Sequence, residues 1–331
     1  MRFRPVSRAF VAATVTSVVI STLAVILMVL PRVSSGDTTS SGAPSTTGRT
    51  DRSTPPSTPP RPAPEAIRYV ALGSSYAAGP DSHGIVDEKC LRTANDYPHQ
   101  VAAAWRMDLT DVTCSGSTID NILSMPQRNR AQAPQIEAVT ADTDLVTITT
   151  GGNDVNYIGR LTSASCLNVL QTDASQILSQ RCRPQTNLPD ATDPATQLDY
   201  RELERGLVQV VAAVKARAPK AVVMIVDYLP VVDVSRTCAS VPLTREQLVQ
   251  TVQTYNALIG ATRAAAAASG ALLVDASAQG ANHTACSAEP WVYGYRRPAP
   301  YHPNRAGRQA MAGMVIDALR QTSLQEPPIP S

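Results

Sequence analysis

The stretch that decides the fold is IRYVALGSSYAAG, residues 67–79, which follows a Ser/Thr/Pro-rich tract. Its first six residues are mostly apolar and read as a β-strand that ends at Gly73. Ser74 and Ser75 then stand where the chain turns. A serine on a tight turn between a strand and a helix can expose its hydroxyl group above the sheet. The stretch therefore predicts a strand that delivers a candidate nucleophile, Ser75.

Similar apolar runs recur along the chain, and helical patterns separate them. The predicted strands cover residues 67–72, 109–112, 145–149, 221–226 and 271–274. The predicted helices cover residues 97–105, 203–216 and 244–268, the third with a capping box of Thr244 and Gln247, and a last helix after Pro303. Buried strands separated by helices indicate a parallel sheet covered on both faces. Ligands on such sheets bind at the carboxyl ends of the strands, so the chemistry is sought there.

Three further segments supply polar groups for such a site. Residues 114–118, CSGST, follow the second strand, and there the Gly116 amide is placed to face an oxyanion. Residues 150–154, TGGND, follow the third strand, and the Asn153 side chain can donate to the same oxyanion. His302 stands just before the last helix. A serine becomes a nucleophile only when a base takes its proton, and the tetrahedral intermediate needs fixed donors.

Together these blocks resemble the SGNH (GDSL-type) hydrolases, and the actinobacterial secreted esterase/lipase branch is the most similar. The resemblance covers residues 67 to 322 and implies a flavodoxin-like three-layer α/β/α sandwich with a mostly parallel five-stranded sheet. It also implies a serine esterase or lipase that hydrolyses carboxylic esters through an acyl-enzyme on Ser75, with His302 as base. The amides of Ser75 and Gly116 and the side chain of Asn153 would form the oxyanion hole. No cofactor and no metal are implied.

The chain departs from the family pattern at two positions. Ser74 replaces the aspartate that usually precedes the nucleophile, and Ala299 replaces the aspartate that usually stands three residues before the histidine. Some relatives in the secreted branch orient the imidazole with a backbone carbonyl, so the resemblance implies that the Ala299 carbonyl orients His302. Asp227 and Asp275 follow predicted strands and are the alternative carboxylates, although residues at such positions more often cap the following loop.

All six cysteines lie beyond the N-terminal apolar run. An even number there indicates disulfides, and the spacing alone leaves the connectivity open. No CxxC pair or Cys/His cluster has the spacing of a zinc site, so no metal site is predicted. The secreted branch carries three sequential disulfides. The pairs that this resemblance implies are Cys90 with Cys114, Cys166 with Cys182, and Cys238 with Cys286.

The N-terminus carries the pattern of an export segment. Arg2, Arg4 and Arg8 precede an uncharged run over residues 9–30 that is long enough to cross a bilayer. A signal anchor is slightly favoured over a cleaved signal peptide, and both place the body of the protein outside the cytoplasm. The predicted domains are the signal over 1–32, a disordered linker over 33–66, the hydrolase domain over 67–322 and a disordered tail over 323–331.

The composition excludes several other classes of protein. A count of 29 Lys and Arg against 27 Asp and Glu, without a basic stripe, argues against a nucleic-acid binder. A hydrophobic content of 43% excludes a disordered chain. Phe3 and Phe10 are the only phenylalanines and lie outside the domain, so Ala, Val, Leu and Ile are predicted to form the core. We expect a monomer that acts on a small-molecule or lipid ester and meets the membrane through its N-terminal segment.

Two other functions stay open on the sequence. An acyltransferase that replaces water with an alcohol of the cell envelope needs the same residues. A catalytically inactive envelope-binding domain is compatible with the missing aspartate. His83, His99 and His283 are interpreted as surface or structural residues, and Asp154 as a support for its loop. Residues 154–194 are interpreted as a pocket wall with no helix assigned, and the acyl length of the substrate is not indicated.

Overall fold

A central sheet of five strands organises the protein. The computed structural model describes residues 66–127, 132–172 and 194–326, and these residues belong to one compact unit. The sheet has the order β4-β1-β5-β6-β7, and each neighbouring pair is parallel. Its strands are β1 (Arg68–Gly73), β4 (Asp108–Asp111), β5 (Leu145–Thr149), β6 (Val222–Val226) and β7 (Leu272–Val274). The five predicted strands are confirmed to within one residue at each end.

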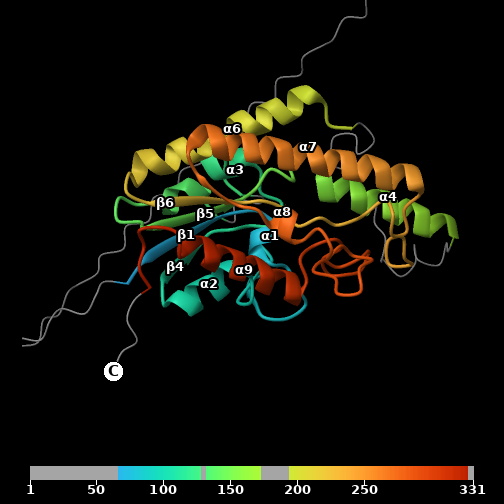
Figure 1. Ribbon diagram of the computed structural model, residues 1–331, viewed down its shortest axis with the longest axis horizontal. Helices are drawn as coiled ribbons and strands as arrows, with labels where there is room; N and C mark the ends of the chain where they lie inside the picture. The colour runs from blue at the N-terminus through green and yellow to red at the C-terminus, as the bar shows by residue number, and fades with distance from the viewer. Residues whose placement is uncertain (1–65, 128–131, 173–193, 327–331) are drawn as a thin grey trace, which may run out of the picture. The chain divides into compact units, whose positions relative to one another are not determined.

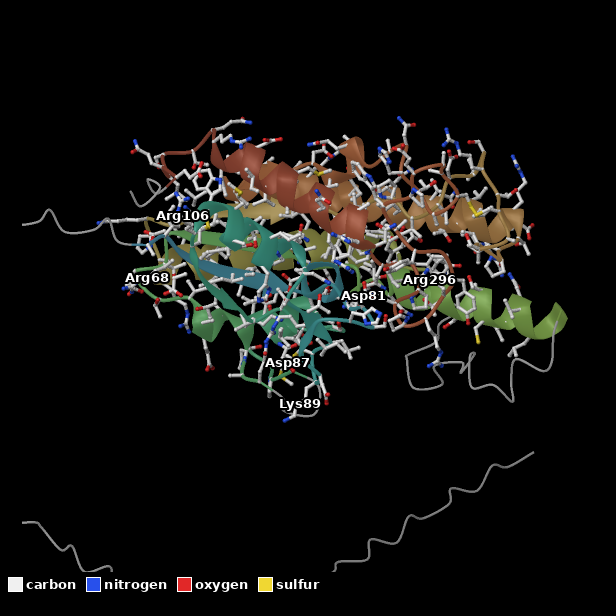
Figure 2. The ribbon with its side chains drawn as sticks, turned by 90° about the horizontal axis from the view of Figure 1, so that it is seen from below. Arg68, Asp81, Asp87, Lys89, Arg106 and Arg296 are labelled. Carbon is white, nitrogen blue, oxygen red and sulfur yellow. A yellow bond between two sulfur atoms is a disulfide. The ribbon has the colours of Figure 1, made fainter. Side chains whose placement is uncertain are left out.

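The strand order places β1 between β4 and β5. Tyr69 is in register with Leu145 and Gly73 with Thr149, so β1 and β5 end at the same edge of the sheet. Figure 2 shows Arg68, at the start of β1, and Asp81, beyond its end, well apart along the strand direction. The connection after β1 leads to β4 on one side of it, and the connection after β4 leads to β5 on the other side. Open α/β sheets bind their ligands at the strand edge where the order reverses in this way.

Helices cover both faces of the sheet, as Figure 1 shows. The helices on one face are α2 (Tyr97–Trp105) and α9 (Arg305–Leu319). Those on the other are α3 (Ile119–Leu123), α6 (Gln197–Arg217) and α7 (Arg245–Ser269), with α4 (Tyr157–Thr172) packed on α7. The short helices α1 (Ser75–Ala78) and α8 (Ala276–Gln279) follow β1 and β7. The three-layer α/β/α fold is thus confirmed.

Side-chain caps fix where the long helices begin. At the start of α7 the Gln247 amide donates to Thr244 Oγ1 over 3.2 Å, and the Thr244 amide donates to Gln247 Oε1 over 2.9 Å. The predicted capping box is therefore confirmed. At the start of α9 the Gly307 amide donates to Asn304 Oδ1 over 3.0 Å. This cap ends the preceding loop two residues after His302, which fixes the position of that loop against the helix.

Tyrosine supplies the large side chains of the core, so the prediction of a core made by Ala, Val, Leu and Ile is incomplete. The largest side chains with less than 2% exposure include Tyr69, Tyr76, Tyr97, Tyr157, Tyr228 and Tyr301. A buried hydroxyl group needs a hydrogen-bond partner. The Tyr69 hydroxyl is hydrogen-bonded to Thr147 Oγ1 at 2.7 Å, and the Tyr97 hydroxyl to Thr149 Oγ1 at 2.8 Å. These tyrosines therefore connect the sheet to its neighbours as well as filling space.

The sequence-based prediction did not include helix α4, the short helices α3 and α8, or a small hairpin. Helix α4 occupies the first part of the segment that was interpreted as a pocket wall, and residues 173–193 of that segment lie outside the described residues. A small antiparallel hairpin is formed by β2 (Ile85–Asp87) and β3 (Arg92–Thr93). Figure 2 shows Asp87 and Lys89 close together at this hairpin.

Two disulfides are present among the described residues. Cys90 is bonded to Cys114 and Cys238 to Cys286, which are pairs that the family resemblance implied. The pairing of Cys166 with Cys182 stays a prediction, because Cys182 lies outside the described residues. The predicted signal or anchor, the linker and residues 327–331 of the tail lie outside them too. Within the described ranges, no helix has the length and apolar character that a membrane span requires.

Candidate active site

Ser75 is the first residue of α1, directly after the carboxyl end of β1. The preceding turn is tight, because the Ser74 amide donates to Thr149 O over 2.9 Å. Gly73 has a φ of 150°, and a Cβ atom there would lie 2.4 Å from Thr149 O. Only glycine fits this close approach of two strands. The turn leaves the Ser75 side chain partly exposed at the strand edge.

His302 meets Ser75 across the strand edge. Its Nε2 atom lies 2.7 Å from Ser75 Oγ, and its Nδ1 atom lies 2.8 Å from the carbonyl oxygen of Pro300. A carbonyl only accepts, so Nδ1 carries the proton and Nε2 is left as the acceptor for the serine hydroxyl. The two hydrogen bonds therefore set the tautomer that a general base requires.

The carbonyl that orients His302 is not the one that was predicted. Ala299 O instead accepts a hydrogen bond of 3.3 Å from the backbone amide of His302, closing a tight turn. Tyr301 has a φ of 63° within this turn. Because the Ala299 carbonyl closes the turn, the carbonyl of Pro300 is the one that faces the imidazole. The prediction for Ala299 is wrong by one residue, although a backbone carbonyl does occupy the orienting position.

Burial controls the charge of His302. Desolvation by the surrounding protein lowers the pKa of the imidazole from 6.5 to about 4, although the hydrogen bond to Pro300 acts in the opposite direction. The Tyr76 ring contributes to this environment, with its centroid 5.5 Å from that of the imidazole. His302 is therefore neutral at pH 7, in the protonation state that accepts a proton.

The segments after β4 and β5 bring the other predicted residues to the same edge. Gly116 has a φ of 88°, and a Cβ atom there would meet nothing within 4 Å, so space is open beside it. Asn153 Nδ2 donates to Ser117 O over 2.8 Å, which ties the two segments together. Within residues 66–127, 132–172 and 194–326, neither the Ser75 nor the Gly116 amide donates to another residue. Both amides can therefore serve a ligand.

Gln135 connects the segments and was missed by the sequence analysis. It lies in the 3₁₀ helix η2 (Gln135–Ala138) and is 1% exposed. Its Oε1 accepts from the Gly73 amide over 2.6 Å, and its Nε2 donates to Gly73 O over 2.9 Å and to Ser117 Oγ over 3.0 Å. One side chain therefore fixes the end of β1 relative to the Gly116 segment. No sequence pattern marked it, because glutamine at a turn is unremarkable without its partners.

Tyr228 plays a similar part after β6. Its hydroxyl oxygen accepts from the Gly152 amide over 3.1 Å and lies 3.1 Å from Ser74 Oγ. A Cβ atom at Gly152 would lie 2.9 Å from the Tyr228 ring, so this contact requires glycine. Burial raises the pKa of Tyr228 to about 12, and the hydroxyl stays protonated. Tyr228 therefore fixes the serine and asparagine segments relative to one another.

A buried ion pair holds the histidine segment to the serine segment. Arg308, in α9, is 1% exposed, and its Nη2 donates to Asp81 Oδ2 over 2.8 Å. Its Nη1 donates to Pro303 O over 3.3 Å. Burial alone would raise the pKa of Asp81, but the hydrogen bonds from Arg308 and Ser82 hold it below its ordinary value. The pair joins the loop after α1 to the loop that carries His302.

The other carboxylates near strand ends serve local structure. Asp275 caps α8 by accepting from the Ala278 amide over 2.9 Å, and it pairs with Arg263 at 2.9 Å. Asp227 is buried, which raises its pKa to about 7, and its Oδ1 accepts from the Ser277 amide over 2.8 Å. Asp154 accepts from the Ile119 amide over 3.0 Å at the start of α3. Their described hydrogen bonds do not include His302.

The remaining histidines have local surroundings. His83 is exposed. His283 stacks on Trp291 with ring centroids 3.8 Å apart, and its Nδ1 lies 2.7 Å from Glu289 O. His99 lies between Asp96 and Asp111, at 2.8 and 3.4 Å. The interpretation as structural residues agrees with the contacts of His283. His99 differs from that expectation, because two carboxylates face its imidazole ring.

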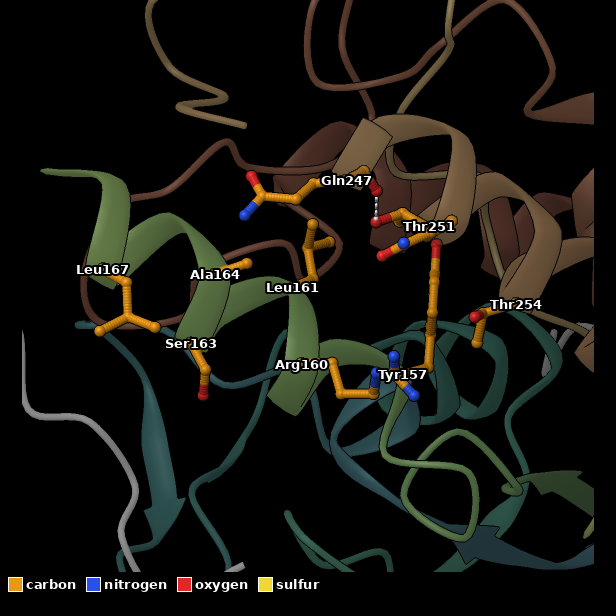
Figure 3. Close-up of a pocket in the computed structure, with 10 residues that line it drawn as sticks. Tyr157, Arg160, Leu161, Ser163, Ala164, Leu167, Gln247, Thr251 and Thr254 are labelled. Atoms are coloured by element: carbon orange, nitrogen blue, oxygen red, sulfur yellow. Dashed lines mark hydrogen bonds between the residues drawn. The ribbon is translucent and has the colours of Figure 1, made fainter. Parts of the chain in front are cut away.

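Two hollows lie near the candidate site. The first lies beside the Asn153 segment, and the second lies beside α4, the helix that follows this segment. One of about 540 Å³ includes Asn153 among its lining residues and is bounded by α3 and α6. The other, of about 250 Å³, lies between α4 and α7 and is drawn in Figure 3. There Leu161 and Ala164 of α4 stand across from Gln247 and Thr251 of α7. The first hollow adjoins a candidate oxyanion donor and has room for part of a substrate.

The chain is similar in sequence to known lipases over most of its length. A model of the GDSL-like lipase/acylhydrolase family matches residues 71–310. Lipase 2 of Streptomyces coelicolor is 32% identical over 275 residues, which cover 78% of this chain and 87% of that protein. A lipase of Streptomyces rimosus is 29% identical over 252 residues, covering 75% and 84% of the two chains.

Solved structures are similar over the same part of the chain. The crystal structure of an extracellular lipase from Streptomyces rimosus has a TM-score of 0.57 at 27% identity, covering 77% of this chain and 99% of that one. The crystal structure of a phospholipase A1 from Streptomyces albidoflavus has the same TM-score at 24% identity, covering 78% and 99%. The second similarity concerns the fold.

Proposed function

The chain belongs to the GDSL-like lipase/acylhydrolase family and is a carboxylic ester hydrolase, and from this premise we propose that Ser75 and His302 are its catalytic pair. The observation that carries the proposal is the hydrogen bond of 2.7 Å between Ser75 Oγ and His302 Nε2. It joins two residues that are 227 positions apart in the chain. This geometry weighs against a catalytically inactive binding domain, which has no need for a neutral base on a serine.

In the proposed reaction His302 Nε2 takes the hydroxyl proton as Ser75 Oγ attacks the ester carbonyl carbon. The tetrahedral intermediate collapses, the bond to the alcohol oxygen breaks, and the imidazolium gives its proton to the leaving alcohol. Water then attacks the acyl-enzyme, with His302 again as base. The carboxylic acid leaves, and Ser75 recovers its proton. The Pro300 carbonyl keeps the imidazole in the required tautomer throughout both halves.

The proposed oxyanion hole consists of the Ser75 and Gly116 amides and Asn153 Nδ2. The second proton of Nδ2 is left for the substrate, because Ser117 O takes only one. Fixed donors of this kind typically contribute about 10²–10³ each to the rate. Gln135 and Tyr228 support the proposal, since both hold the segments that carry these donors.

We further propose that the enzyme acts outside the cytoplasm. The basic residues and apolar run of the N-terminus have the pattern of an export signal. The two described disulfides are typical of an oxidising compartment. The similar Streptomyces rimosus protein is named as an extracellular lipase. Detection of the folded enzyme in the culture medium or on the cell surface, and not in the cytosol, tests this part.

The catalytic assignment is tested with a series of p-nitrophenyl esters of graded acyl length and with a fluorophosphonate probe. We expect the wild-type protein to hydrolyse the esters and to be labelled on Ser75, as seen by peptide mapping. Ser75→Ala should lower turnover by about 10⁶, and His302→Ala by nearly as much, because the pair acts as one unit.

Ser82→Ala is the matched control, since Ser82 lies on the exposed loop near the same helix. It should retain labelling and turnover. Normal turnover of a folded Ser75→Ala variant, or labelling at another serine alone, would exclude Ser75 as the nucleophile. Adding an alcohol acceptor to the assay separates hydrolysis from acyl transfer by the product formed.

A further inference from the structure

A compact group of three ionisable side chains lies away from the catalytic pair, where α2 begins and β4 ends. Asp96 is the N-cap of α2, His99 is in its first turn, and Asp111 is the last residue of β4. One ligand atom from each of the three lies within 4.8 Å of the others. The Asp96 side chain is 0% exposed, that of Asp111 is 4% exposed, and that of His99 is 31% exposed.

In each of the two carboxylates, one oxygen accepts hydrogen bonds from the described part of the protein and the other accepts none. Asp96 Oδ1 accepts from the backbone amide of His99 over 2.9 Å, and Asp111 Oδ1 accepts from the amide and hydroxyl of Thr113 over 2.9 and 2.7 Å. Asp96 Oδ2 and Asp111 Oδ2 are buried and take no hydrogen bond from any described residue. An unpartnered buried carboxylate oxygen is costly, so these two atoms call for a ligand.

The three side chains converge on one point. Asp111 Oδ2, one of the two oxygens without a hydrogen bond, lies 3.4 Å from His99 Nδ1. Asp96 Oδ1 lies 2.8 Å from the same nitrogen. Ligands bound tetrahedrally to a zinc ion at about 2.0–2.1 Å are separated by roughly 3.3 Å. The two separations from His99 Nδ1 lie within about 0.5 Å of this value, and the ligand atoms of the two carboxylates lie within 4.8 Å of one another, so local adjustment of the side chains suits a small four-coordinate cation.

The charges and atom types also suit such an ion. Two ionised carboxylates and a neutral imidazole carry a charge of about −2, which a divalent cation balances without any protons. One nitrogen and two oxygen ligands match zinc and similar transition metals better than calcium or magnesium, which prefer oxygen alone. His99 is the most exposed of the three and leaves an approach from solvent.

We propose that Asp96, His99 and Asp111 form a binding site for one divalent transition-metal ion of the zinc type, with water as the fourth ligand. The sequence analysis missed this site because it searched for Cys and His spacing, and the third ligand comes from another element. The site is structural. Asp96 packs against Gly79, where a Cβ atom would lie 2.8 Å from Asp96 Cβ, and Gly79 ends the helix that begins with Ser75. A bound ion would thus tie α2 and β4 to the back of the nucleophile helix.

The rival occupant of the cluster is the proton. The nearby carboxylates of Asp111 and Asp96 raise the pKa of His99, and burial raises that of Asp96, so protons alone would also balance the charge. The two occupants differ in what they predict. A proton-bridged cluster gives no metal stoichiometry and no stabilisation on adding zinc, whereas a metal site gives both.

The test uses the untagged full-length chain, stripped with a chelator and titrated with Zn²⁺ by calorimetry, with Mg²⁺ and Ca²⁺ as comparison ions. We expect one Zn²⁺ per chain and a Tm that rises by several degrees with Zn²⁺ alone. Asp111→Asn and His99→Gln should weaken binding by more than the roughly 10–100-fold that loss of a second-shell group costs. His283→Gln is the matched control, because it removes a histidine whose Nδ1 faces a backbone carbonyl, and it should leave binding unchanged.

Absence of Zn²⁺ binding by the wild-type chain would overturn the proposal, as would binding that survives in both cluster variants or is lost in the control. If a cluster variant does not fold, Co²⁺ bound to the wild-type chain decides. If the visible absorption spectrum of the Co²⁺-loaded chain has the intense bands of a four-coordinate ion, the proposed site is supported. If the spectrum is that of hydrated Co²⁺, the proposal is overturned. Ser75→Ala should bind Zn²⁺ like the wild type, so the outcome is independent of the catalytic proposal.

Discussion

At the scale of single residues, the proposed base His302 is oriented by a backbone carbonyl dipole, in the position where a catalytic triad has a carboxylate. The Pro300 carbonyl accepts from Nδ1 over 2.8 Å and fixes the tautomer. It stabilises the imidazolium less than a full negative charge would, because it carries only a dipole. The low pKa of His302 follows from the same arrangement, since burial is not offset by a neighbouring anion.

The pH dependence of turnover should reflect this environment. As the proposed general base, His302 must be neutral, and burial lowers its pKa in the folded protein to about 4. We therefore expect kcat/KM to stay level down to about pH 5 and to fall about tenfold per pH unit below pH 4, since this parameter reports the free enzyme. Initial rates on a soluble ester across this range check it. An acid limb near 6.5 would show that the imidazole is solvated.

The stability of the fold provides the control for that profile. The pKa of His302 in the unfolded chain is near 6.5, so the unfolded state binds more protons than the folded state between pH 6.5 and about 4. The contribution of His302 to stability therefore decreases as pH falls through this window. Unfolding measured at each pH separates loss of the base from loss of the fold.

The absence of a carboxylate from the pair leads to a prediction about Asp227 and Asp275. In a triad enzyme, replacing the aspartate by asparagine lowers turnover by about 10⁴. We expect Asp227→Asn and Asp275→Asn each to lose far less, because one accepts from Ser277 N and the other caps α8. Steady-state kinetics of the folded variants measure this. A loss of triad size in either one would reveal a displaced third member.

The limits of sequence reasoning are clearest at this scale. Ser75, Gly116, Asn153 and His302 stand in recognisable blocks, so their placement at one strand edge could be predicted. The choice between the Ala299 and Pro300 carbonyls depends on how a four-residue turn closes, and a shift of one residue has no signature in the sequence. Gln135 has meaning only through partners more than 15 positions away.

At the scale of elements, the five strands were predictable because each is a short apolar run that ends in a turn segment. Helix α4 was not, because its sequence, YIGRLTSASCLNVLQT, is rich in Ser and Thr and is followed by a polar stretch. The helix is stabilised by packing, because its own Leu161 and Cys166 side chains are buried against the rest of the protein. Tertiary packing decided what local propensity left open.

The connection between β6 and the catalytic edge can be tested at Tyr228. Tyr228→Phe removes the acceptor of the Gly152 amide and the partner of Ser74 Oγ. Leaving a buried amide without a partner should lower the free energy of unfolding by about 1–3 kcal/mol. Turnover should fall by roughly 10- to 100-fold, since a small displacement of a catalytic donor costs about that much. Chemical denaturation and ester kinetics measure the two effects.

Tyr255→Phe is the matched control for this variant. It also removes a tyrosine hydroxyl that binds backbone, donating to Tyr228 O over 2.8 Å, but among the described residues this hydroxyl makes no hydrogen bond to the serine or asparagine segment. It should affect stability and leave turnover near the wild-type value. An equal fall of turnover in both variants would mean that the loss at Tyr228 comes from general loosening of the core.

At the scale of the whole molecule, the disulfides restrict the unfolded chain. Cys90 and Cys114 are 24 residues apart, and Cys238 and Cys286 are 48 apart. In the chain-entropy account each bridge then contributes roughly 3–4 kcal/mol. Replacing either pair by serine should lower the free energy of unfolding by about that amount in denaturant titrations.

Non-reducing peptide mapping of the same samples tests the third pair, Cys166 with Cys182. Three sequential pairs are expected. A free thiol or a crossed pair in the wild-type protein would contradict the assignment. Serine variants that unfold at the wild-type denaturant midpoint would show that the bridges add nothing beyond the packed core.

The separation of Ser75 from His302 has a consequence for timing during synthesis. The serine directly follows the turn after the first strand of the sheet, and its proposed base comes 227 residues later, shortly before the last long helix. A chain that leaves the ribosome N-terminus first therefore presents the serine without its proposed base for almost the entire length of the domain. In the proposed mechanism, hydrolysis starts only after the last segment has emerged and α9 has packed on the sheet. If Ser75 and His302 form the catalytic pair as proposed, the order of the elements along the chain keeps the nascent hydrolase inactive until its synthesis is complete.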